Sequence, residues 1–145
     1  MRFYIAGPWG DGPKLYQLAK DIELCGHIVT ASWLRRSLSP KDWLDADAGA
    51  REDLNDILSC DAVINFTCTP DRGYMTGGRH VEFGFAMAAG LKQFVVGPRE
   101  NIFHEMVDVT QFDTFSAFIN WLRMESQSAG DPAGEAVVLS GERVA

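Results

Sequence analysis

The chain has 145 residues, a net charge of -7 and 46% hydrophobic residues, which predicts one globular domain around a single core. This acidic balance argues against binding to a nucleic-acid polymer, because phosphate neutralisation needs a basic stripe and the one adjacent basic pair is Arg35 and Arg36. No apolar run approaches the roughly 18 residues that cross a bilayer, and the first residues do not resemble a signal peptide, so we expect a cytoplasmic protein with no membrane partner.

The cysteines and histidines indicate neither disulfides nor a metal site. The three cysteines are Cys25, Cys60 and Cys68. They include no C-x-x-C pair, and their odd number argues against a disulfide framework, so we expect reduced, mostly buried thiols. The three histidines have no metal-ligand spacing with cysteine or carboxylate residues, and no cofactor is predicted.

The first third of the chain begins with a strand and a helix. Residues 3–7, "FYIAG", predict a buried strand that ends on a glycine. Residues 13–26 have apolar side chains at helical spacing between a proline and a glycine, which is typical of a helix start and end. A short second strand is expected over residues 27–33, "HIVTASW", and residues 35–48 have no clean period and predict a long loop with a partial turn.

The middle of the chain predicts a helix followed by a buried strand. The helix runs from about Gly49 to Cys60, with Leu54, Ile57 and Leu58 directed inward. Residues 61–67, "DAVINFT", are continuously apolar after the first aspartate, which is typical of a strand covered on both faces.

The remaining elements continue the alternation of helix and strand. A helix is expected over residues 79–90 and a fourth strand over residues 93–97. A loop or short helix then leads to a fifth strand over residues 107–112. The last helix is expected over residues 113–124, with Asp113 as its N-cap.

This alternation implies a parallel sheet with helices on both faces. We predict a flavodoxin-like α/β domain over residues 1–124, with three layers and a doubly wound, five-stranded parallel sheet of order 2-1-3-4-5. Residues 125–145 are polar and rich in glycine and alanine, and predict a disordered C-terminal tail. Ligands of such sheets bind beyond the carboxyl ends of strands 1 and 3, here the glycine-rich loops at residues 7–12 and 68–78.

Glu82 is the acid that follows the second of these loops. We expect it in the first turn of the helix over residues 79–90, where the helix dipole and free amides stabilise a charged carboxylate. The resulting low pKa would suit a nucleophile better than a general acid. The alternative is an ordinary first-turn acid, although the next residues, "FGFAMAAG", are apolar on every face and leave only solvent or a cleft for the carboxylate.

The glycine-rich loop allows a backbone to approach a ligand closely, through Gly73, Gly77 and Gly78. It contains neither a dinucleotide-binding nor a Walker motif, so it indicates phosphate binding only weakly. Three residues offer a hydroxyl or a positive charge to a phosphate: Thr76, Arg72 and Arg79. Arg79 could equally be a solvated residue at the helix start.

Acids and tryptophans elsewhere allow both functional and structural interpretations. Asp53 and Asp56 lie on one helix, and either is a candidate site residue or an ordinary exposed acid. Trp9, Trp33 and Trp43 fall in predicted loops near the crevice. An indole there can stack on a purine or pyrimidine, or it can cover the core.

Four segments in order resemble the nucleoside 2-deoxyribosyltransferase family, including its nucleotide N-glycosidase branch. "FYIAGP" resembles the first strand of that family, and "REDLNDILSCDAVINF" resembles its acid-bearing helix and the next strand. "GGRHVEFGFAMAAGLKQFVV" resembles its glycine loop, catalytic glutamate, small-residue helix and following strand, and "GPREN" occupies the loop after that strand. The resemblance covers residues 2–104, about seven tenths of the chain.

The resemblance implies roles for individual residues. Glu82 would be the nucleophile that attacks the sugar C1′, Asp53 would orient the sugar or assist the leaving base, and Tyr4 would lie near both sugar and nucleophile. The implied substrate contacts come from the two loops and the segment after the fourth strand: Gly7, Pro8, Trp9, Thr76, Gly77, Gly78, Arg79 and Asn101.

Position 76 bears on the substrate. The transferases place an aspartate six residues before the glutamate, whereas the monophosphate-specific glycosidases place a phosphate-binding serine there. Thr76 therefore favours a 5′-nucleotide and, mildly, hydrolysis. Those glycosidases also carry a serine and an arginine in the first loop, where this chain has Pro8 and Gly10, so Arg72 or Arg79 would have to substitute.

The resemblance thus implies cleavage of the N-glycosidic bond of a (2′-deoxy)nucleoside or its 5′-monophosphate. A covalent glycosyl-Glu82 intermediate would be resolved by water in an N-glycosidase or by a second base in a transferase. The implied partner is this small molecule, and the implied assembly is a homodimer or higher homo-oligomer in which Asn101 matches an asparagine that the transferases borrow from a partner subunit.

Two alternatives remain open at the level of sequence. One is a phosphoribohydrolase of the cytokinin-activating type, whose P-G-G-x-G-T-x-x-E motif shares only the glycine pair with "TGGRHVE". The other is a nucleotide-binding or sensing module without catalysis, since a fold does not by itself imply an activity.

Overall fold

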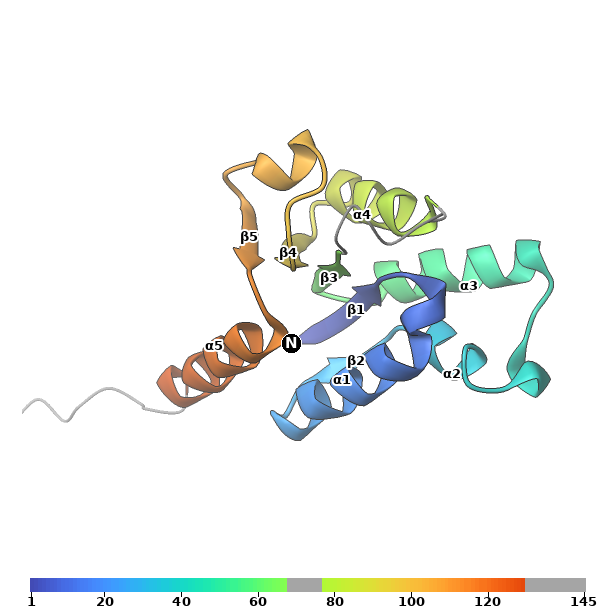
Figure 1. Cartoon of the computed structure of the whole chain (residues 1–145), viewed down its shortest axis with the longest axis horizontal. Coiled ribbons are helices and arrows are strands. Elements are labelled where there is room, and N and C mark those ends of the chain that lie inside the picture. Colours follow the sequence, from blue (N-terminus) through green and yellow to red (C-terminus); the bar gives the residue numbers. More distant parts are fainter. Residues whose placement is uncertain (68–76, 130–145) are drawn as a thin grey trace, which may run out of the picture.

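The computed structural model describes residues 1–67 and 77–129, which form a five-stranded sheet of order β2-β1-β3-β4-β5 with helices around it (Figure 1). All four strand pairings are parallel. The strands are β1 (Arg2–Ala6), β2 (Ile28–Val29), β3 (Ala62–Phe66), β4 (Lys92–Val96) and β5 (Val109–Phe112). The predicted flavodoxin-like architecture and strand order are confirmed.

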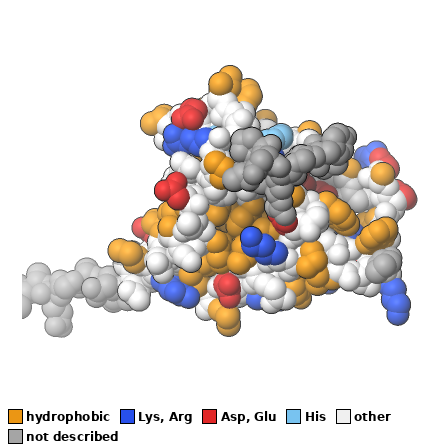
Figure 2. Space-filling view, in the orientation of Figure 1, with side chains coloured by type: hydrophobic (Ala, Val, Ile, Leu, Met, Phe, Trp, Pro, Cys, Tyr) orange, Lys and Arg blue, Asp and Glu red, His pale blue; other side chains and the backbone are white. Residues whose placement is uncertain are grey.

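The described residues also form five α-helices and three short 3-10 helices. The helices are α1 (Gly12–Leu24), α2 (Trp33–Arg36), α3 (Ala46–Leu58), α4 (Gly78–Ala88), α5 (Phe115–Ser128), η1 (Trp9–Asp11), η2 (Pro40–Asp42) and η3 (Ile102–Glu105). Figure 1 shows α1 and α5 on one side of the sheet and α3 and α4 on the other. Figure 2 shows charged and hydrophobic side chains interspersed over one face of the molecule, and no helix of the described residues is long and apolar enough to cross a membrane.

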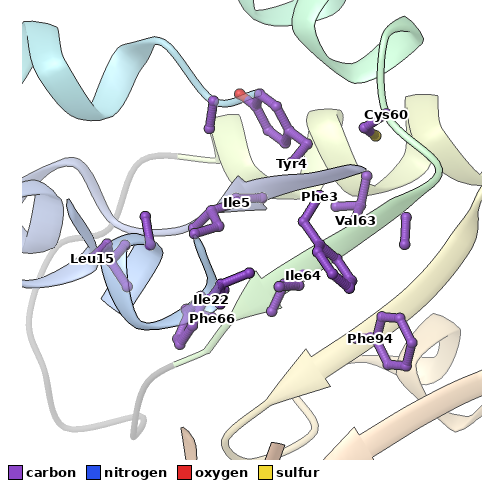
Figure 3. Close-up of a cluster of buried hydrophobic side chains, with 14 of the residues drawn as sticks. Phe3, Tyr4, Ile5, Leu15, Ile22, Cys60, Val63, Ile64, Phe66 and Phe94 are labelled. Carbon is purple, nitrogen blue, oxygen red and sulfur yellow. The ribbon is translucent and has the colours of Figure 1, made fainter. Parts of the chain in front are cut away.

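The central strands follow from their residue pattern. Every residue of β3 is buried, as expected for a parallel strand between two helical layers. In β1 the side chains of Phe3 and Tyr4 point to opposite faces (Figure 3). Phe3 meets Phe118 of α5 edge-to-face at 6.0 Å between ring centroids, whereas Tyr4 faces the α4 side.

The segment around β2 differs from the prediction. The strand is confined to Ile28–Val29, and Trp33 begins α2 rather than ending a strand. The indole nitrogen of Trp33 donates a hydrogen bond to the carbonyl oxygen of Ile5 at 2.7 Å, and the side chain is buried. This tertiary contact holds Trp33 at the start of a short helix where the sequence predicts the end of a strand.

The predicted loop over residues 35–48 is wrong in part, because it contains the end of α2, all of η2 and the start of α3. Helix α3 begins before the expected Gly49, at Ala46, because the Asp45 side chain accepts a hydrogen bond from the amide of Ala48 at 2.8 Å. Its inward face includes the buried Ile57, but Leu58 is 61% exposed, so the prediction that Leu58 points inward is wrong.

Helix α5 is capped by Thr114 and not by the predicted Asp113. The Thr114 hydroxyl accepts a hydrogen bond from the Ala117 amide at 3.2 Å, which is the N-cap pattern. The helix continues to Ser128, so residues 125–128 extend it beyond the predicted domain boundary. Residues 130–145 of the predicted tail lie outside the described part of the chain.

Candidate active site

Tyr4 and Glu82 form the centre of the candidate site. The Tyr4 hydroxyl donates a hydrogen bond to Oε1 of Glu82 at 2.7 Å, across 78 positions of sequence. Tyr4 has no exposed surface and lies in β1, an inner strand of the sheet. Burial and the neighbouring Glu82 raise the pKa of Tyr4 well above its usual value near 10, so the phenol remains a donor at neutral pH.

The electrostatic expectation for Glu82 is overturned. Helix α4 begins at Gly78, so Glu82 lies in its second turn rather than the first. Burial raises the pKa of Glu82 from 4.5 to about 7, although the hydrogen bond from Tyr4 lowers it. Asp53 raises this pKa further and Arg36 lowers it. The predicted low pKa is wrong because the helix dipole acts mainly on the first turn, whereas desolvation dominates here.

Asp53 of α3 belongs to an ion-pair cluster that joins α3 to Arg36 of α2. Its Oδ1 accepts a hydrogen bond from the guanidinium of Arg36 at 2.5 Å, and the same guanidinium pairs with Glu52. Burial raises the pKa of Asp53, and the bond to Arg36 acts in the opposite direction. Asp56 has a separate role, because its Oδ2 accepts hydrogen bonds from both the amide and the hydroxyl of Ser32 just before α2.

Aromatic side chains form a cavity beside Asp53. Trp9 stacks on Trp33 with ring centroids 5.8 Å apart, and Trp43 meets Trp9 edge-on at 6.4 Å. A cavity of about 440 Å³ opens between them and α3. Its lining includes Trp9, Trp43, Leu44, Ala50, Asp53 and Arg36. Trp33 is buried and does not line this cavity, whereas Trp9 and Trp43 are about half exposed and available to a ligand.

The first loop positions Trp9. A Cβ at Gly7, the residue after β1, would lie 2.5 Å from Cδ1 of Leu15, so a larger residue there would require the Leu15 side chain to move. Pro8 is the N-cap residue of η1, which begins with Trp9. Gly7 and Pro8 therefore direct the chain so that the indole reaches the cavity.

The glycine loop is described only at its end. Thr76, Arg72 and Gly73 lie outside the described residues. Gly77 is the N-cap residue of α4, and Gly78 is its first residue.

Arg79 and Asn101 lie toward η3. Arg79 is buried and donates a hydrogen bond to Oε1 of Glu100 at 2.8 Å, so the alternative of a solvated residue at the helix start is wrong. The side-chain oxygen of Asn101 accepts hydrogen bonds from the amides of Phe103 and His104 and caps η3. Asn101 also lines a second cavity of about 400 Å³, together with His80, Phe83, Gly84, Met87 and Phe103.

Sequence reasoning missed Arg36 as a site residue. In the sequence it appears only as half of a basic pair, in a segment that predicts a loop. In α2 it lies one turn after the buried Trp33, and both side chains are buried, whereas Arg35 between them is exposed. Its carboxylate partners are 16 and 17 positions away on another helix, so no local pattern indicates them.

The described residues contain no group of three or more histidine, cysteine, aspartate or glutamate side chains that could hold a metal ion. The carboxylates of the site are instead engaged by Tyr4 and Arg36. The site therefore offers the Glu82 carboxylate held by Tyr4, the second carboxyl group of Asp53, and an aromatic cavity that Asp53 lines.

No protein-family model matches the chain, and no curated protein sequence matches it. Its fold is similar to that of BcmB, a CMP N-glycosidase from Clostridium botulinum, with 20% identity, a TM-score of 0.59, and 86% of this chain and 99% of that chain covered. A 3-dehydroquinate dehydratase-like protein from Bifidobacterium longum is more distant, with 12% identity, a TM-score of 0.41, and 90% and 99% covered. The similarity to BcmB supports the fold.

Proposed function

We propose that this protein cleaves the N-glycosidic bond of a (2′-deoxy)nucleoside or its 5′-monophosphate. The observation that carries the proposal is the hydrogen bond from Tyr4 to Glu82, which orients a mostly buried carboxylate in a region that also holds Asp53. The aromatic cavity beside Asp53 is of a size that small-molecule sites commonly have. The likeness in fold to a CMP N-glycosidase supports a nucleotide as the substrate class.

In the proposed mechanism Glu82 acts as the nucleophile. Because Tyr4 holds Oε1, the other carboxylate oxygen attacks C1′ of the sugar. The C1′–N bond breaks through an oxocarbenium-like transition state, and its electron pair moves to the base nitrogen. Water then attacks C1′ and gives its proton to Asp53, which lost one to the leaving base, the ester bond to Glu82 breaks, and the sugar is released with retained configuration. A second base in place of water would give transfer.

Asp53 is the proposed proton source for the leaving base. A departing base is stabilised when it is protonated as its bond to C1′ lengthens. Burial raises the pKa of Asp53, although the hydrogen bond and charge of Arg36 act in the opposite direction, so Asp53 is a better proton donor than an exposed aspartate. Its position on the wall of the aromatic cavity would bring it near a base stacked on Trp9 or Trp43.

The choice between hydrolysis and transfer, and between a nucleoside and a monophosphate, still rests on Thr76 and its sequence context. A homodimer is also part of the proposal. The side chains that would be buried in it lie in and around η3, where Ile102, Phe103 and Val107 are largely exposed.

The proposal is tested by incubating the protein with deoxy- and ribonucleosides and their monophosphates, with and without an acceptor base, and measuring free base by chromatography. Glu82→Ala should lower base release by about 10³-fold or more while nucleotide binding persists. The matched control is Glu125→Ala, an exposed acid on α5 that should leave the rate unchanged. Ligand binding without turnover in wild type would favour the sensing module, and equal rates in Glu82→Ala would exclude the nucleophile.

The direction of the pH profile separates two roles for Glu82. A nucleophile must be ionised, so kcat/KM should rise as the pH increases from 5 through the pKa of about 7. The raised pKa also suits a general acid that protonates the base, and that role predicts a fall over the same range. Initial rates of base release across this range decide between them.

A further inference from the structure

Arg36 lies between the acids of the candidate site and the wall of its aromatic cavity. Its residue is only 7% exposed, although it carries a permanent charge. One arm of the guanidinium donates to Asp53 at 2.5 Å, and the other pairs with Glu52 and donates to the Ser32 hydroxyl at 3.1 Å. A buried arginine that holds two carboxylates fixes their positions as well as balancing their charge.

The backbone of Arg36 is tied to the cavity as well. Its carbonyl oxygen accepts a hydrogen bond from the indole nitrogen of Trp43 at 2.6 Å. The adjoining Ser32 is held by Asp56, so α2 is joined to α3 by side chains from both helices. A shift of Arg36 would therefore move Asp53 and Trp43 together.

Glu82 is surrounded by groups from three elements. Tyr4 of β1 donates to it, and the charges of Asp53 on α3 and Arg36 on α2 both influence it. Asp53 destabilises the ionised form of Glu82, and Arg36 is the positive charge that opposes this effect. Without Arg36, the carboxylates of Glu82 and Asp53 would lie near each other without its positive charge. Tyr4 would still donate its hydrogen bond to Glu82, but it carries no charge.

We propose that Arg36 is the positioning residue of this site: it holds the Asp53 carboxylate and the Trp43 wall in place, and its positive charge balances the carboxylates of Asp53 and Glu52 beside Glu82. The consequence for catalysis rests on the proposed function, whereas the effect on the ionisation of Glu82 does not.

Two substitutions separate the geometric role from the charge. Arg36→Gln removes the charge that balances Asp53, so the acid limb of base release should move to higher pH, with a severalfold larger loss at pH 6 than at pH 8. Arg36→Lys keeps the charge but cannot hold Asp53 and Glu52 with two arms, so its pH profile should stay close to wild type while kcat falls more than KM changes. Arg35→Gln, the exposed neighbour on the same helix, is the matched control and should behave as wild type.

A second readout does not depend on turnover. The side-chain carboxyl carbon of Glu82, labelled with ¹³C and assigned by its loss in Glu82→Gln, is titrated by NMR in wild type and in each arginine variant. The midpoint should be higher in Arg36→Gln than in wild type and unchanged in Arg35→Gln. If wild type cleaves none of the compounds tested, the proposed function fails while this titration still tests Arg36.

The inference is overturned by either of two results. One is an unchanged Glu82 midpoint in Arg36→Gln. The other is an equal loss of rate at every pH in Arg36→Gln together with wild-type kcat in Arg36→Lys, since a merely structural residue would give that pattern. If Arg36→Gln does not fold, the kcat of Arg36→Lys decides the question. A wild-type kcat in Arg36→Lys would then count against a positioning role.

Discussion

Glu82 lies where two requirements conflict. A nucleophilic carboxylate must be charged, yet burial in an apolar helix layer favours the neutral acid and raises the pKa of Glu82 to about 7. The Tyr4 hydrogen bond and the Arg36 charge oppose burial without overcoming it. The sequence shows an acid near a helix start, but the balance among these effects depends on neighbours that are brought together only by folding.

This balance predicts how stability depends on pH. The folded state binds the Glu82 proton more tightly than the unfolded chain, whose pKa is 4.5. Ionisation of Glu82 therefore lowers the free energy of unfolding: the effect is absent below pH 4.5, grows up to about pH 7 and is complete above it. Glu82→Gln removes the charge and keeps an oxygen for Tyr4, so it should raise the free energy of unfolding at pH 8 by roughly 1–3 kcal/mol.

Urea denaturation of wild type and Glu82→Gln at pH 8 and pH 4 measures this difference. The two proteins should be nearly equal at pH 4, and the exposed Glu125→Gln should match wild type at both values. A stabilisation of the same size at pH 4 and pH 8 would show that charge burial is not its cause.

At the scale of elements, α3 shows what helical spacing can and cannot specify. Ile57 and Leu58 are adjacent and were both expected to face the core, yet Ile57 has no exposed surface and Leu58 is 61% exposed. Ile57→Ala should therefore lower the free energy of unfolding by about 2–4 kcal/mol, because it leaves a cavity, whereas Leu58→Ala should change it by less than about 0.5 kcal/mol. Chemical denaturation of the two variants tests this, and similar losses in both would contradict the burial pattern.

Element boundaries depended on contacts that the local sequence does not reveal. The sequence predicts Asp113 as the cap of α5, whereas the structure shows that Thr114 caps it. Helix α2 is anchored by the bond from Trp33 to Ile5, which joins positions 28 residues apart. Buried strands such as β3 were predictable because an apolar run needs no such long-range information.

At the scale of the whole molecule, the strand order followed from the alternation of elements and the length of the chain. The proximity of Tyr4 and Glu82 was implied by family resemblance rather than by periodicity, and the hydrogen bond between them now gives it a geometry. The Arg36 cluster was not predictable, since it joins two helices across a segment without a repeating pattern.

The packing of α5 predicts where the fold can be shortened. Phe118 and Leu122 of α5 are buried in the main core cluster, and Phe118 meets Phe94 of β4 edge-to-face at 5.6 Å. Residues 130–145 are polar and rich in glycine and alanine, so a chain ending at Ala129 should keep its Tm within about 2 °C of the full chain.

A chain ending at Phe112 loses α5 and should show no cooperative transition, because uncovering several aromatic core residues costs about as much as the 5–15 kcal/mol that usually holds a domain together. Thermal unfolding followed by circular dichroism compares the three chains. A large drop in Tm on removing residues 130–145 would place part of the tail in the folded core, and a cooperative transition without α5 would mean that the sheet and its remaining helices form a sufficient core.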